Sequence, residues 1–64
     1  MNIKDVRKSI ATDRPVYASF NNRGVCGRVR VIGVTAHDHG EITIKAINGD
    51  MLRLHGSTVA FDRG

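Results

Sequence analysis

From Pro15 onward, apolar and polar residues alternate with a period of two, and turn-forming residues interrupt this alternation at short intervals. Alternation places successive side chains on opposite faces of a strand, so the pattern is typical of half-buried β-strands. It predicts strands over 16–20, 25–36, 41–47, 51–55 and 58–61. Five short strands joined by tight turns favour an all-β fold, a small and strongly bent barrel.

One face of each predicted strand is apolar and should form the core. The expected inward-facing residues are Val16, Ala18, Phe20, Val29, Val31, Ile42, Ile44, Ala46, Leu52 and Leu54. Gly27 and Gly33 interrupt the long second strand, where glycine commonly marks a bend or bulge. Cys26 is the only cysteine, so we expect no disulfide within the chain and interpret it as a small buried strand residue, with a reactive thiol as the alternative.

The residues before Pro15 predict a short N-terminal helix over 1–13. Its apolar stripe is Ile3, Val6 and Ile10, at spacings of three and four. Asn2 can cap the helix, and Asp5 in the first turn favours its dipole. The residue before a proline is pushed out of the α region, which ends the helix. We therefore expect one domain over 1–64, with the barrel occupying 14–64.

The chain has 64 residues, and a chain this short buries only about 60% of its unfolded surface. The two edge strands of its sheet would be templates for another chain. A small core with exposed edges predicts self-association. No apolar stretch approaches the roughly 20 residues of a membrane helix. We expect no membrane association and a cytoplasmic location.

Ten Lys and Arg residues stand against six Asp and Glu, for a net charge of +4. The isoelectric point is near 10.0, which is the electrostatic footprint of a nucleic-acid-binding domain. Excess charge can also serve solubility alone. Arg28 and Arg30 fall on one face of the second strand and could follow a phosphate backbone, or could form a solvated strand face.

Residues 54–61 are Leu-His-Gly-Ser-Thr-Val-Ala-Phe. This segment resembles the second sequence box of the Sm/LSm family, which includes the bacterial Hfq proteins. Residues 15–22 and 25–29 resemble the first strand, the turn and the glycine-bearing second strand. The chain departs from the family at Gly33, where an aspartate is usual, and at the His-Asp-His loop that follows.

The resemblance implies an SH3-like, Sm-like barrel that forms a homo-oligomeric ring of about five to seven subunits through strands four and five. It also implies binding of single-stranded, U- or A-rich RNA by two loops near the pore. The corresponding residues here are His37, Asp38, His39, His55, Gly56 and Ser57. Imidazoles can stack on unpaired bases, and hydroxyls or carboxylates can accept from base edges. The histidines can equally be surface-turn residues or backbone-bonded strand ends.

No catalytic constellation is recognisable, because no nucleophile motif surrounds the serines and Glu41 has no obvious carboxylate partner. The loop histidines are metal ligands by type, but His-x-His without cysteine partners is a weak signal. We expect no enzyme activity, no metal and no cofactor. The resemblance implies a ring-forming RNA-binding protein with a role in RNA metabolism or chaperoning. The alternatives are a monomeric SH3-like adaptor or inhibitor of another protein, and a ring that serves only as a scaffold.

Overall fold

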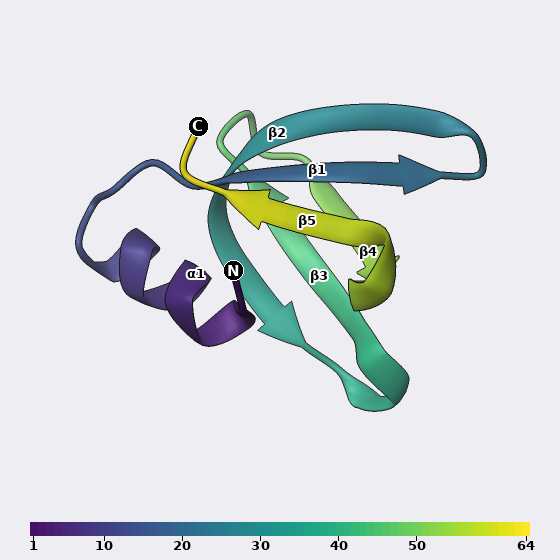
Figure 1. Ribbon diagram of the computed structural model, residues 1–64, viewed down its shortest axis with the longest axis horizontal. Coiled ribbons are helices and arrows are strands. Elements are labelled where there is room, and N and C mark those ends of the chain that lie inside the picture. The colour runs from purple at the N-terminus through teal and green to yellow at the C-terminus, as the bar shows by residue number, and fades with distance from the viewer.

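The computed structural model describes residues 1–64, apart from the side chain of Asn22. In chain order the elements are α1 (Ile3–Ala11), β1 (Tyr17–Asn22), β2 (Val25–Ala36), η1 (Asp38–Gly40), β3 (Glu41–Ala46), β4 (Met51–His55), η2 (Gly56–Thr58) and β5 (Val59–Asp62). Figure 1 shows them, with η1 and η2 as short 3-10 turns. The prediction of one helix and five strands is confirmed.

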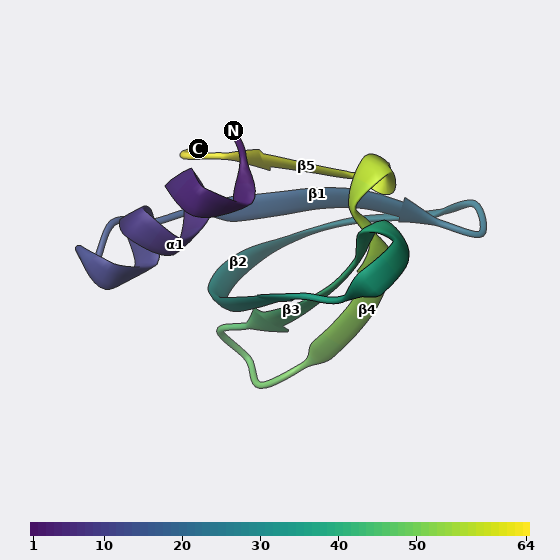
Figure 2. The ribbon, with the colours of Figure 1, turned by 90° about the horizontal axis from the view of Figure 1, so that it is seen from below.

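The five strands form one antiparallel sheet in the order β4-β3-β2-β1-β5. The first half of β2 pairs with β1 and the second half pairs with β3, so β2 belongs to both layers of the folded sheet (Figure 2). The register against β3 shifts between Val31 and Gly33, in agreement with the bend or bulge expected at Gly33, whereas the register against β1 continues unshifted through Gly27. The sheet is strongly bent and open, with β4 and β5 at its two edges.

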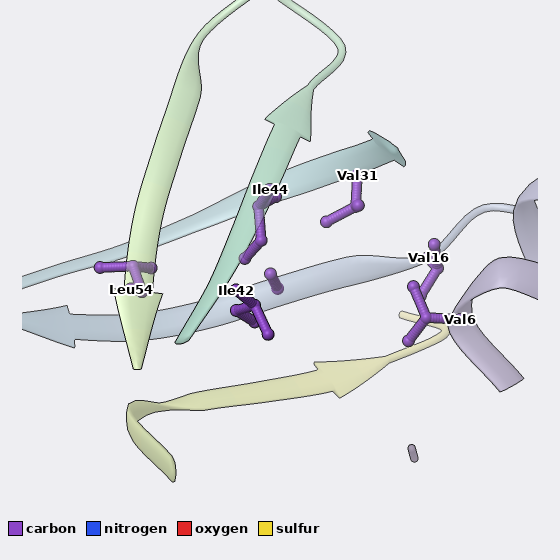
Figure 3. Packing of buried hydrophobic residues seen from close by; sticks show 7 residues of the cluster. Val6, Val16, Val31, Ile42, Ile44 and Leu54 are labelled. Atoms are coloured by element: carbon purple, nitrogen blue, oxygen red, sulfur yellow. The ribbon is translucent and has the colours of Figure 1, made fainter. Parts of the chain in front are cut away.

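The core lies between the two layers and is closed at one end by α1 (Figure 3). Its buried members are Val6, Val16, Ala18, Val31, Ile42, Ile44 and Leu54. All of these except Val6 are residues that alternation placed inward, although β1 runs over Tyr17–Asn22 instead of the predicted 16–20, so that Val16 lies just before the strand. Val6 of α1 is 0% exposed, so the apolar stripe of the helix is part of the core. Completely burying a Val side chain stabilises the fold by roughly 1.5–3 kcal/mol.

The ends of α1 lie inside the predicted 1–13 because capping residues stand outside the helix. The side chain of Asn2 accepts from the Asp5 N–H at 2.8 Å. At the other end, the backbone N–H and the hydroxyl of Thr12 bond to carbonyl oxygens of the last turn. The helix thus starts as expected and stops before Asp13, which has a φ of 57°.

The prediction that Cys26 is buried is wrong, because this residue is exposed. Cys26 has the same strand parity as Arg28 and therefore faces outward. It also lies beyond the reach of β5, which pairs with β1 only as far as Phe20. The hairpin between β1 and β2 consequently projects past the rest of the molecule (Figure 1).

Candidate functional site

The two loops implied as the RNA site come together at one corner of the molecule. Glu41 pairs with His55, so the end of η1 stands beside the end of β4. In Figure 2 the turn that follows β2 lies next to the turn between β4 and β5. A Cβ placed on Gly56 would lie 3.3 Å from the carbonyl oxygen of Gly40. The two loops implied by the resemblance, 37–39 and 55–57, therefore meet through Gly40, and we call these six residues the loop corner.

His55 is held in a fixed orientation within the loop corner. Its Nδ1 lies 2.7 Å from the Ser57 hydroxyl and 3.2 Å from the Ser57 backbone nitrogen, whose N–H it accepts. Its carbonyl accepts from the Thr58 hydroxyl at 2.7 Å. The ring lies against Gly40, where a Cβ would stand 2.8 Å from Nε2. Gly40 has a φ of 77°, so both its conformation and this contact require glycine.

The other face of the loop corner is built from the turn after β2. His37 Nε2 lies 2.7 Å from the Thr43 hydroxyl, and the His37 N–H donates to the Glu41 carbonyl at 2.7 Å. Asp38 and His39 are both exposed. His39 has a φ of 61°, a conformation that turns the chain sharply into Gly40. The turn thus exposes a carboxylate and an imidazole to solvent, and its last residue, Gly40, lies against the His55 ring.

The loop corner contains no Lys or Arg residue, and the nearest cation is already paired. Arg53 makes two hydrogen bonds to the Glu41 carboxylate, at 2.9 and 2.7 Å. Recognition here would therefore depend on stacking and hydrogen bonding more than on attraction to phosphates. Among the described side chains, no group of three or more His, Cys, Asp or Glu is placed to hold a metal ion.

Arg28 and Arg30 do not join the loop corner. They lie in the half of β2 that pairs with β1, whereas the turn to η1 follows the other half. Arg28 forms an ion pair with Asp62, and its guanidinium lies 4.7 Å from the centre of the Tyr17 ring. Arg30 is half-buried beside the α1–β1 linker. Arg28 is thus neutralised within the chain, and the expected basic stripe is interrupted.

A shallow hollow between the projecting hairpin and η2 was not anticipated from the sequence. Its volume is about 420 Å³ and its lining is mainly apolar. The residues that line it are Ser19, Phe20, Asn21, Cys26, Gly27, Ser57, Thr58, Val59 and Ala60. The Phe20 ring covers Gly27, its cross-strand partner, where a Cβ would stand 2.5 Å from the ring. The sequence signal that could have located this hollow is the alignment of Phe20 with Gly27 across the β1–β2 hairpin.

The chain matches no protein-family model, and comparisons with curated proteins and with solved structures likewise give no match. None of these comparisons connects the chain to the Sm/LSm family. The structure contains no helix of the length and apolarity that crossing a bilayer requires, in the part of the chain that it describes.

Proposed function

We propose that this chain is an Sm-like barrel subunit that assembles into a ring and binds single-stranded RNA at the loop corner. The observation that carries the proposal is the position of that corner. It lies where β4 turns through η2 into β5, and these are the two edge strands of an open sheet. Pairing of one copy's β4 with the next copy's β5 would bring the corners of successive copies near one another.

The edges have the chemistry that strand pairing needs. An edge strand carries unpaired backbone N–H and C=O groups along its free side. The hollow beside β5 adds apolar surface, and Val59 and Phe61 are only partly buried on the inner face. On the other edge, Leu52 is partly buried and Met51 is 61% exposed. A neighbouring copy would cover apolar groups at both edges, and its strand would hydrogen-bond to the unpaired backbone N–H and C=O groups.

The loop corner supplies groups suited to unpaired bases. The His55 ring is fixed by Ser57, so little side-chain entropy is lost when a base stacks on it. Asp38, His39 and the Ser57 hydroxyl can exchange hydrogen bonds with base edges. Repetition around a ring would multiply one weak site without new contacts. U- or A-rich sequence preference comes only from the family resemblance.

Light scattering tests assembly. We expect a mass of about five to seven times the 7.0 kDa of one chain. Val59 lines the hollow beside β5 and also packs against the core, so Val59→Asp should yield monomers, and circular dichroism must show that these monomers are still folded. The matched control is Val25→Asp, which makes the same change at an exposed site of the projecting hairpin and should leave the mass unaltered. A monomeric wild-type chain would contradict the ring and favour the adaptor alternative.

Titration of fluorescent oligo-U and oligo-A at several salt concentrations tests RNA binding. His55→Ala should weaken binding about tenfold or more, since stacking on one base contributes roughly 1–3 kcal/mol. His55→Asn retains an acceptor for the Ser57 N–H but has no imidazole, so it should weaken binding equally. If only the alanine variant loses affinity, His55 acts by capping the turn. If neither does, the loop corner is not the site.

A further inference from the structure

A second, polar hollow lies beside the last turn of α1, where the linker to β1 meets the residue that follows β5. Its volume is about 240 Å³, equal to roughly eight water molecules of about 30 Å³ each. A phosphoryl group therefore fits inside it together with some water. The lining residues are Asp5, Lys8, Ser9, Thr12, Arg14 and Arg63.

The charges around this polar hollow are unbalanced. Lys8, Arg14 and Arg63 are cations and Asp5 is the one carboxylate among the lining residues, which leaves an excess of two positive charges. The ion pairs found among the described side chains lie elsewhere, on the outer face of the sheet and beside η1. None of the three cations has a carboxylate oxygen within 4.0 Å. All three cations are exposed, so solvent screens their charges in part, and the net excess of positive charge favours an anion in the hollow.

Ser9 adds a hydrogen-bond donor without a partner. The residue is 1% exposed, and its hydroxyl has no hydrogen bond to any described group. A buried polar group without a partner destabilises a protein, so a bound acceptor would remove a penalty. The other hydroxyl is engaged, because that of Thr12 donates to the Lys8 carbonyl at 2.9 Å. The Ser9 hydroxyl is therefore the donor without a partner, and because its oxygen is nearly inaccessible to solvent, an acceptor in the hollow would reach it only after the lining residues shift.

The C-terminal end of α1 opposes anion binding, but its effect is smaller. A helix carries about half a negative charge at this end, on its unpaired carbonyl groups. Here the carbonyl of Lys8 accepts from the Thr12 N–H at 3.0 Å, and that of Ser9 accepts from the Arg14 N–H at 2.8 Å. Two full positive charges exceed half a negative one, so the hollow stays electropositive.

We propose that the polar hollow binds a phosphomonoester in its dianionic form. Lys8, Arg14 and Arg63 would balance the charge, and the Ser9 hydroxyl would donate to a phosphate oxygen. A phosphomonoester carries close to two charges above its second pKa of about 6, whereas a phosphodiester carries one. The group can belong to a free nucleotide or to the terminal phosphate of a strand. This inference rests neither on the ring nor on RNA binding at the loop corner.

Calorimetric titration of the intact chain with UMP, and with uridine as the matched ligand, tests the site. We expect UMP to bind and uridine not to bind. Loss of one charge-assisted hydrogen bond should weaken UMP binding about tenfold in Ser9→Ala and in Arg63→Gln. Arg7→Gln makes the same charge change on α1 outside the hollow and should leave affinity unchanged. Equal affinity of all four proteins for UMP, or no binding by the wild type, would overturn the proposal.

Oligo-U carrying a 5′-phosphate or a 5′-hydroxyl then separates the two sources. If the 5′-phosphate adds affinity that Arg63→Gln abolishes, the hollow takes a strand end. If UMP binds but the 5′-phosphate adds nothing, the hollow takes a free nucleotide. Because UMP contains no strand, failure of the loop corner to bind RNA leaves the UMP result unaffected, and the two proposals fail separately.

Discussion

The imidazole of His55 fills the space that a side chain on residue 40 would need. Gly40 is therefore constrained twice, by its positive φ and by this ring. Gly49 has a positive φ of 94° but no atom within 4 Å of its would-be Cβ. A substitution at Gly49 therefore tests backbone strain alone, whereas a substitution at Gly40 tests backbone strain together with the contact to His55.

We predict that Gly49→Ala destabilises the fold by about 1 kcal/mol, the usual penalty for an L-residue in the left-handed region. Gly40→Ala should be worse by a further 1–3 kcal/mol or so, because it also displaces the His55 ring. Urea unfolding measures both. Adding His55→Ala to Gly40→Ala should recover the extra loss. Equal destabilisation by the two glycine substitutions would show that the His55 ring moves aside without a cost in free energy.

The buried hydroxyl of Ser9, which has no hydrogen-bond partner, should also affect stability. In phosphate-free buffer, Ser9→Ala should raise the free energy of unfolding by about 1 kcal/mol, because it removes a buried hydroxyl without a partner. In phosphate buffer the gain should shrink, since the bound anion stabilises the wild-type fold more than that of the variant, which binds it more weakly. Thermal melts of both proteins in the two buffers measure the difference. A gain that is identical in both buffers would contradict a role for the hydroxyl in binding.

Among the elements, the stability of α1 depends more on its N-terminal cap than on its length. It has nine residues, and isolated helices shorter than about 12–15 residues are marginal in water. We predict that Asn2→Ala destabilises the protein by about 1 kcal/mol, because the Asp5 N–H loses its acceptor. Asn2→Asp keeps that acceptor and should be nearly neutral. Denaturant unfolding of the two variants checks this, and equal losses would mean that the cap is not what matters.

Alternation predicted some elements to the residue and missed others for identifiable reasons. β2 and β4 have the predicted bounds, because turn residues stand directly beside them. β5 begins at Val59 instead of Thr58, since the Thr58 hydroxyl bonds to the His55 carbonyl and completes η2. β3 ends at Ala46 instead of Ile47. Side-chain capping of this kind is local chemistry that periodicity does not register.

At the scale of the whole molecule, the loop corner could be predicted and the charge pairing could not. The loops meet because β3 and β4 are antiparallel neighbours, which a short hairpin turn already implies. The ion pair of Arg28 and Asp62 joins residues 34 positions apart and depends on the register of β5 against β1. The polar hollow likewise needs Arg63 beside α1. Neither follows from any local pattern.

Assembly also has a thermodynamic signature at this scale. If neighbouring copies complete the sheet, the melting temperature should rise with protein concentration, because association stabilises the folded state. We predict such a rise for the wild type and for Val25→Asp, and none for Val59→Asp. Scanning calorimetry over a hundredfold concentration range measures it. A concentration-independent wild type would mean that each copy is stable without neighbours.

The pairing of β5 with β1 also dictates when the molecule can fold. Residues 59–62 pair with residues 17–20, so the earlier strand must wait for one that is synthesised much later. Contacts this distant in the chain slow folding, because loop-closure entropy is lost before they form. During translation, the flank of β1 stays uncovered until residue 62 has left the ribosome. A nascent chain halted before that point would be the species most prone to aggregate and most in need of a chaperone.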